Sequence, residues 1–162
     1  MLNKNNKKGF TVAELLISLA ISGLLLAAVA FAFQSSIMNY SENENIFKTI
    51  NSARQALCRI TTQLRTAEAV DPCSPSYQCA FYTPDMDLVT YDYRSDENKL
   101  YLVSDSTDYL LCDNVTAMSF TKNVVVQDAV TKVKSVQISM TVQNGDVTNT
   151  ISAASVIRRN LN

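Results

Sequence analysis

The sequence of 162 residues contains no histidine. This absence excludes Ser-His-Asp and Cys-His catalytic arrangements and every metal site built on imidazole ligands. Positive charge is also scarce, with 14 basic residues against 15 acidic ones, and the pair Arg158-Arg159 is not a basic stripe. Because phosphate binding needs clustered positive charge, we expect no nucleic-acid partner. With no catalytic constellation visible, we also expect no enzyme activity, no metal site and no cofactor.

The N-terminal part of the chain lacks charge over a long stretch. Leu15–Phe33 is 19 residues without a charged side chain, close to the roughly 20 residues that a helix needs to cross a bilayer core. The flanking charges are positive before this run and negative after it: Lys4, Lys7, Lys8, Glu42 and Glu44. This asymmetry places the N-terminus in the cytoplasm.

Two interpretations of this segment compete. One is a cleaved signal peptide, since Ala28-Val29-Ala30 and Ala30-Phe31-Ala32 both have the small-x-small pattern of signal peptidase sites. The other is a retained membrane helix. Glu14 favours the second, because a carboxylate in a membrane helix costs roughly 2.5–3.5 kcal/mol at the centre and marks a functional site by default. The plain alternative is an interfacial carboxylate that reaches water.

The residues around Glu14 resemble a known recognition sequence. Lys7-Lys8-Gly9-Phe10-Thr11-Val12-Ala13-Glu14-Leu15-Leu16 is similar to the prepilin-peptidase site of type IV pilins and type II secretion pseudopilins. The resemblance implies cleavage between Gly9 and Phe10 and N-methylation of Phe10. It also implies that Glu14 faces the N-terminal amine of a neighbouring subunit. Many major pilins carry a proline near the middle of this helix, and 10–33 has none.

Helical periodicity continues beyond the uncharged run. Neither glycine nor proline occurs in Gln34–Val70, and Asp71-Pro72 predicts the end of a helix that starts at Phe10. One apolar stripe follows the helical repeat: Ile37, Tyr40, Phe47, Ile50, Ala53, Leu57, Ile60, Leu64 and Ala67. We expect this stripe to pack on the chain's own sheet, with a coiled-coil partner as the alternative.

The remaining residues have the pattern of short strands. The predicted strands are Gln78–Thr83, Asp87–Tyr93, Lys99–Ser104, Tyr109–Cys112, one or two within Val115–Val126, and a hairpin around Asn144-Gly145. A two-residue Asn-Gly loop sets Val142 opposite Val147, Met140 opposite Asn149, Ile138 opposite Ile151 and Val136 opposite Ala153. The sequence therefore predicts an α+β pilin fold, with a long N-terminal helix on an antiparallel sheet.

The domain organisation follows from these segments. We expect residues 1–9 to be a leader, 10–33 the transmembrane half of the helix, 34–70 its amphipathic half, and 71–162 a β-rich head. The helix stretch Ala53–Ala67 and the closing strand Ile151–Arg159 also resemble the W-type minor pilins and J-type minor pseudopilins.

The function implied by the resemblance is structural. We expect a minor subunit that primes or caps a type IV pilus or a type II secretion pseudopilus. Its partners would be other pilin or pseudopilin subunits, the prepilin peptidase and the inner-membrane assembly platform. It would be a single-pass inner-membrane protein with a periplasmic head before assembly, and part of the fibre afterwards. The alternatives are a binding module at a pilus tip and a plain secreted protein.

Four cysteines, Cys58, Cys73, Cys79 and Cys112, lie outside any C-x-x-C motif. An even number in an exported head favours disulfides. A Cys73–Cys79 bridge would close a short loop, and Cys58–Cys112 would then join the helix to a strand, worth roughly 4 kcal/mol in the chain-entropy model. Four cysteines allow three connectivities, and free buried thiols are the alternative.

Two further groups of residues have ordinary explanations. Acidic pairs at Asp85/Asp87, Asp96-Glu97 and Asp105/Asp108 lack the pattern of a calcium loop and are typical of polar turns. Tyrosines at strand spacing favour cross-strand packing over an adhesive surface: Tyr77, Tyr82, Tyr91, Tyr93, Tyr101 and Tyr109.

Overall fold

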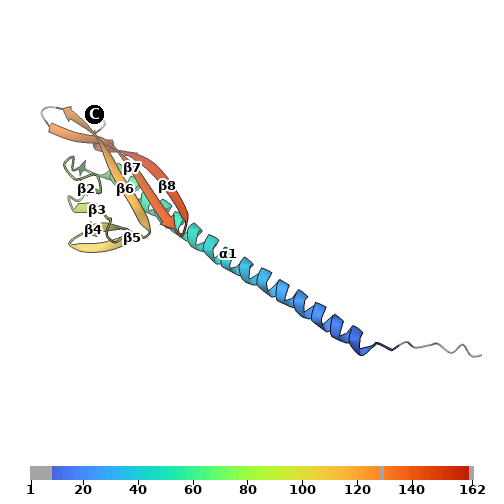
Figure 1. Ribbon diagram of the computed structural model, residues 1–162. Coiled ribbons are helices and arrows are strands. Elements are labelled where there is room, and N and C mark those ends of the chain that lie inside the picture. Colours follow the sequence, from blue (N-terminus) through green and yellow to red (C-terminus); the bar gives the residue numbers. More distant parts are fainter. Residues whose placement is uncertain (1–8, 128–129, 161–162) are drawn as a thin grey trace, which may run out of the picture. The chain divides into compact units, whose positions relative to one another are not determined.

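The computed structural model describes residues 9–127 and 130–160 (Figure 1). The chain divides into two compact units, Met1–Asn43 and Glu44–Asn162. The described part of the first unit consists of Gly9 to Thr11 and the N-terminal portion of one helix, α1, which runs from Val12 to Thr66. The predicted leader is residues 1–9, of which 1–8 lie outside the described part of the chain.

The second unit contains the rest of α1 and all the strands. They are β1 (Ala69–Val70), β2 (Gln78–Tyr82), β3 (Leu88–Arg94), β4 (Lys99–Ser104), β5 (Thr107–Cys112), β6 (Val115–Gln127), β7 (Val130–Asn144) and β8 (Val147–Val156), followed by a 3-10 turn, η1 (Arg158–Asn160). They form two antiparallel sheets, ordered β1-β2-β3-β4-β5 and β6-β7-β8. The α+β architecture predicted from the sequence is confirmed, with two sheets in place of the single one expected.

Helix α1 is shorter at both ends than the predicted Phe10–Val70. It begins at Val12 and ends at Thr66, four residues before the expected end. The reason is strand pairing, because Ala69 and Val70 lie opposite Tyr82 and Phe81 as β1. Competition from this antiparallel pair ends the helix before Asp71-Pro72 can do so.

The core of the head lies between the helix and the sheets. The helix buries Thr49, Ala53, Ala56, Leu57, Ile60 and Leu64, against strand residues such as Phe81, Tyr91 and Ile138 that are at most 1% exposed. Burial of the predicted stripe therefore begins at Ala53, and Ile50 is half-buried. Ile37, Tyr40 and Phe47 remain 57%, 74% and 63% exposed and do not join the core.

The β7–β8 hairpin forms where Asn144-Gly145 predicts it, but in a different register. Asn144 pairs with Val147, Val142 with Asn149, Met140 with Ile151 and Ile138 with Ala153. Each β7 residue pairs with a β8 residue two positions later than predicted, because Gly145-Asp146 forms the loop instead of Asn144-Gly145. Gly145 has φ 57°, a value that suits glycine at the first position of a two-residue hairpin loop. A displacement of two leaves every side chain on its predicted face.

The C-terminal end differs from the predicted closing strand Ile151–Arg159. Strand β8 ends at Val156, and Arg158-Arg159 belongs to η1. Arg159 forms an ion pair with Glu68, and the backbone N–H of Ile157 donates to the carbonyl of Lys134. These contacts hold the chain end near β1 and β7.

Candidate functional site

Gly9 and Phe10, the predicted cleavage pair, lie just before the first turn of α1 and are exposed. A Cβ added at Gly9 would meet no atom within 4 Å, and Gly9 is not in a left-handed backbone conformation. The fold itself therefore places no demand for glycine at this position. The side chain of Phe10 is 79% exposed and is equally unused by the fold of the single chain.

Glu14 has a local role that the sequence analysis did not assign. Its Oε2 accepts hydrogen bonds from the backbone N–H of Thr11 at 2.9 Å and from the Thr11 hydroxyl at 3.0 Å. In return, the backbone N–H of Glu14 donates to Thr11 Oγ1 at 3.2 Å. This reciprocal pair is a capping box, with Thr11 at the N-cap and Glu14 at the third helical position.

The signal for the capping box is present in the sequence. Thr11-x-x-Glu14 stands directly before an apolar run, which is the pattern of a helix N-terminus. Both intrachain hydrogen bonds of the carboxylate go to Oε2. Within residues 9–127 and 130–160, Oε1 has no hydrogen-bond partner and is open to a donor from another molecule.

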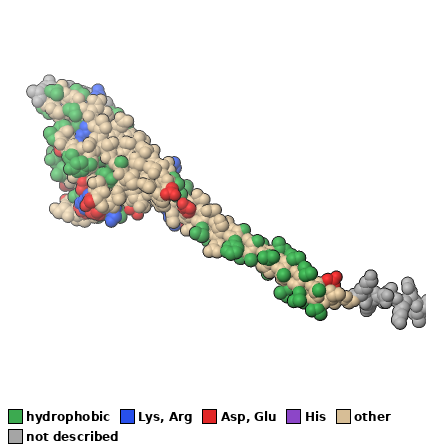
Figure 2. Space-filling view, in the orientation of Figure 1, with side chains coloured by type: hydrophobic (Ala, Val, Ile, Leu, Met, Phe, Trp, Pro, Cys, Tyr) green, Lys and Arg blue, Asp and Glu red, His purple; other side chains and the backbone are tan. Residues whose placement is uncertain are grey.

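The segment after Glu14 carries no charged side chain from Leu15 to Phe33. Within the described residues, α1 is the one helix that is long and apolar enough to cross a membrane, judged by length and composition. Hydrophobic side chains lie along much of its visible face in the space-filling view (Figure 2). The hydroxyls of Ser18 and Ser22 donate to the carbonyls of Glu14 and Ser18, at 2.6 and 2.8 Å. These bonds satisfy both hydroxyls within the helix, as an apolar solvent requires.

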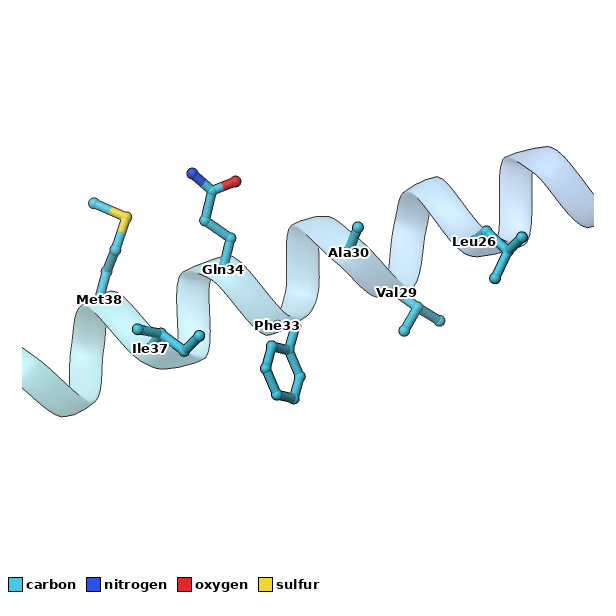
Figure 3. A pocket seen from close by; sticks show the side chains of 7 residues that line it. All are labelled: Leu26, Val29, Ala30, Phe33, Gln34, Ile37 and Met38. Carbon is cyan, nitrogen blue, oxygen red and sulfur yellow. The ribbon is translucent and has the colours of Figure 1, made fainter.

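A shallow apolar groove of 480 Å³ lies on the helix further along (Figure 3). It is lined by Leu26, Val29, Ala30, Phe33, Gln34, Ile37 and Met38. Small Ala30 stands between larger side chains, and Phe33 and Ile37 project from the same side of the ribbon. Such a surface suits lipid or another apolar helix.

The four cysteines occupy two kinds of environment. Cys58 on α1 and Cys73 after β1 are exposed, while Cys79 on β2 and Cys112 on β5 are buried, and all four are separate thiols. Burial raises the pKa of Cys79 to about 12 and that of Cys112 to about 11. Neither the Cys73–Cys79 nor the Cys58–Cys112 bridge is formed in this structure, and both pairings stay predictions.

The acidic residues and tyrosines of the head are mostly structural. Within the described ranges, no three His, Cys, Asp or Glu side chains gather as a metal site. Arg94 joins Asp92 at 3.1 Å and Asp108 at 2.6 Å, and its guanidinium lies over the ring of Tyr101. The hydrogen bonds that the Arg94 guanidinium donates to Asp108 and Asp92 raise the pKa of Arg94 above its ordinary value.

The tyrosines for which cross-strand packing was predicted lie partly in the core and partly on the surface. Tyr91 and Tyr93 are buried, whereas Tyr77, Tyr82 and Tyr109 are 49%, 42% and 53% exposed. The hydroxyl of Tyr91 donates to Gln63 Oε1 on α1, and burial raises its pKa. The exposed tyrosines lie on β5, at the end of β2 and just before β2, and do not form one continuous strand face.

Comparison with known proteins identifies the N-terminal segment. A family model described as the prokaryotic N-terminal methylation motif matches residues 4–30. The match contains Gly9, Phe10, Glu14 and most of the apolar run. Neither the curated proteins nor the solved structures provide a match to the chain. The chain thus carries a type IV pilin-like N-terminal motif.

Proposed function

We propose that this protein is a minor pilin or pseudopilin, a non-enzymatic subunit that primes or caps assembly of a type IV pilus or a type II secretion pseudopilus. One observation carries the proposal. The methylation motif at residues 4–30 overlaps the start of α1, where Glu14 is the single charged side chain between positions 10 and 33. The C-terminal part of the same helix packs on antiparallel sheets, as in a pilin-like fold.

Glu14 supplies the physical reason for assembly. A charged carboxylate in lipid has an unfavourable free energy unless a partner neutralises it. The capping box occupies Oε2 and leaves Oε1 open. In the assembled fibre, the methylated amine of Phe10 from a neighbouring subunit binds Oε1, because two opposite charges offset each other's desolvation only at close range. Subunits then add in one register.

Gly9 serves recognition before assembly. Because neither packing nor backbone conformation requires glycine there, the residue is explained by a peptidase that needs an extended, unhindered chain at the scissile bond. The prepilin peptidase would cut between Gly9 and Phe10 on the cytoplasmic side. The inner membrane would hold the helix, the head would be periplasmic, and the assembly platform would extract the mature chain.

The alternatives make different demands on the N-terminus and the head. A secreted protein cut after Ala30 or Ala32 would lose Glu14, and nothing would then explain the match to a methylation motif. A binding module at a fibre tip would use the same anchor, but its function would depend on residues in the head. Such substitutions would leave fibres intact and abolish adhesion or substrate recognition.

The proposal is tested by expressing Glu14→Ala in cells that assemble the fibre. We expect normal cleavage after Gly9 and loss of the subunit from sheared fibres, measured by immunoblotting of membrane and fibre fractions. Incorporation equal to that of the wild-type chain would contradict the charge-pairing mechanism. A Gly9→Leu variant is the control for processing, and it should keep the leader and stay in the membrane.

A further inference from the structure

A second concave site lies in the head, between α1 and the edge of the five-stranded sheet. It has a volume of 440 Å³, within the range of roughly 300–1,000 Å³ for binding pockets. We call it the β5 cleft. Its lining comes from α1, β3, β4 and β5: Arg59, Gln63, Val89, Leu102, Ser104, Tyr109, Leu110 and Leu111.

The outer wall of the β5 cleft is a sheet edge. Strand β5 is last in the order β1-β2-β3-β4-β5, and among the described strands it pairs with β4 alone. Tyr109 and Leu110 on this strand are 53% and 54% exposed. Exposed edges are usually protected by lysine, proline or a cover, because their unpaired backbone groups attract another strand. Thr107–Cys112 has neither lysine nor proline, and its one charge, Asp108, is bound by Arg94.

The inner wall of the β5 cleft supplies positive charge. Arg59 is exposed on α1 and forms no ion pair with any residue in the described ranges. None of the described residues that line the cleft is an aspartate or a glutamate. Gln63 lies one turn further on, and its Oε1 accepts the Tyr91 hydroxyl. This bond fixes the amide so that its NH₂ group stays available as a donor beside Arg59.

The floor between these walls is apolar. Val89 and Leu102 are 6% and 5% exposed and belong to the core. Leu102 lies opposite Tyr109 in the β4–β5 pair, and Leu111 is the extra residue where the register shifts. A ligand here meets an open backbone edge, an apolar floor, and a cation with an amide donor on the far side.

We propose that the β5 cleft binds an extended, apolar polypeptide segment of another protein that carries a carboxylate. The segment adds as a strand to the edge of β5, its side chains on the cleft side lie beside Tyr109, and its carboxylate binds Arg59. Recognition by strand addition combines backbone hydrogen bonds for affinity with side-chain pockets for specificity. The inference goes beyond the assembly role and does not depend on it, because the site is confined to the head.

Charge distinguishes this occupant from a second copy of the chain. Two β5 strands paired with each other would bring together two Thr107–Cys112 segments, whose single acid is already held by Arg94. That pairing would leave Arg59 without an anion. A segment with its own carboxylate satisfies both the edge and the cation.

Peptide binding to the full-length, reduced chain in detergent micelles tests the proposal. Three dye-labelled hexapeptides of alternating valine and threonine are compared by fluorescence polarisation. One ends in a free carboxylate, one is a C-terminal amide, and one is an amide with glutamate at its penultimate position. We expect at least one acidic peptide to bind about tenfold tighter than the neutral amide, the effect of one charge-assisted hydrogen bond. Which acidic peptide binds tighter tells whether a chain end or an acidic side chain is preferred.

Two arginine variants test whether Arg59 binds the carboxylate of the peptide. Arg59→Gln should abolish the preference for the acidic peptides. Arg54→Gln is the matched control, since Arg54 is also exposed on α1 but lies outside the cleft. Equal loss of the preference in both variants, or no loss in either, would overturn the proposal. So would failure of all three peptides to bind.

Hydrogen exchange locates the strand. Saturating peptide should slow amide exchange in β5 and leave β8, the free edge of the other sheet, unchanged. Protection of β8 would overturn the proposal. Protection of β5 that rises with protein concentration in the absence of peptide would identify a second copy as the occupant and would also overturn it.

Discussion

Three hydrogen bonds join Thr11 and Glu14 at the start of α1: the Thr11 backbone N–H and hydroxyl donate to Glu14 Oε2 at 2.9 and 3.0 Å, and the Glu14 backbone N–H donates to Thr11 Oγ1 at 3.2 Å. The same carboxylate is the proposed acceptor for a neighbour's N-terminal amine. Glu14 thus has a local function in one chain and a proposed intermolecular function in the fibre. The two functions are separable, because a capping box accepts glutamine in place of glutamate.

Glu14→Gln should keep the capping box and remove the charge. We expect this variant to be cleaved and methylated normally but to be reduced at least about tenfold in sheared fibres, because the neighbour's amine loses its counter-charge. Thr11→Ala is the matched control, which removes the cap and keeps the charge. Quantitative immunoblotting of fibres decides between them. If Glu14→Gln assembles normally and Thr11→Ala does not, capping rather than charge pairing explains Glu14.

Ser155 joins the last strand to the helix. Its side chain is 1% exposed, and its hydroxyl donates to the carbonyl of Thr61 at 3.0 Å. Ser155→Ala should lower the free energy of unfolding by about 1 kcal/mol, the net value of such a bond. Urea unfolding of the full chain in detergent, followed by near-UV circular dichroism, measures it. The control is Ser152→Ala on the exposed face of β8, whose expected effect is within about 0.5 kcal/mol; equal effects would contradict the assignment.

The buried thiols should make the reduced protein sensitive to alkali. Cys79 has its pKa raised from 9.0 to about 12 by burial. Because the folded state keeps this proton while the unfolded state loses it, the stabilising contribution is complete below pH 9 and falls as the pH rises toward 12. Cys79→Ala should flatten this loss between pH 9 and 11, whereas Cys73→Ala, at an exposed site, should not. Identical pH profiles for the two variants would show that burial of Cys79 is not the cause.

The same thiols permit a map of disulfides. In the reduced chain at pH 8, iodoacetamide should label exposed Cys58 and Cys73 before buried Cys79 and Cys112. In protein taken from its native membrane without reductant, the predicted Cys73–Cys79 and Cys58–Cys112 bridges would block all four. Peptide mass spectrometry distinguishes these patterns. Rapid labelling of Cys58 and Cys73 in the unreduced native protein would exclude both bridges.

Gly145 occupies the first loop position of the β7–β8 hairpin. With φ at 57°, a side chain at this position is strained, and Gly145→Ala should cost about 1–2 kcal/mol of stability. Gly145→Asn should cost less, because asparagine tolerates the left-handed region. Urea midpoints of the two variants provide the measurement. An alanine variant as stable as the asparagine variant would mean that the loop can adopt another conformation.

Local patterns account for the parts of the fold that the sequence predicts well. Strand β4 has the predicted bounds Lys99–Ser104, and the alternation of Val136, Ile138, Met140 and Val142 places β7's buried face correctly. The predicted bounds and register are wrong where pairing with another part of the chain determines the structure. Ala69–Val70 leaves the helix because Tyr82 and Phe81 pair with it, and the hairpin loop moves by one residue.

The two candidate sites differ in how far the sequence reveals them. Gly9, Phe10 and Glu14 are close in the chain, so their resemblance to a prepilin-peptidase site can be seen in the sequence, although the capping role of Thr11 was missed. The β5 cleft was not predicted, because Arg59 and Tyr109 come from α1 and β5 and meet only through the fold. No local pattern could have joined them.

The mass of the N-terminal peptide from protein recovered from its native membrane tests the central claim most directly. The account predicts a mature chain that begins at Phe10, carries one methyl group on its amine and retains Glu14. A chain that begins at Phe31 or Phe33 would contradict it, because the apolar helix and Glu14 would then be absent from the mature protein.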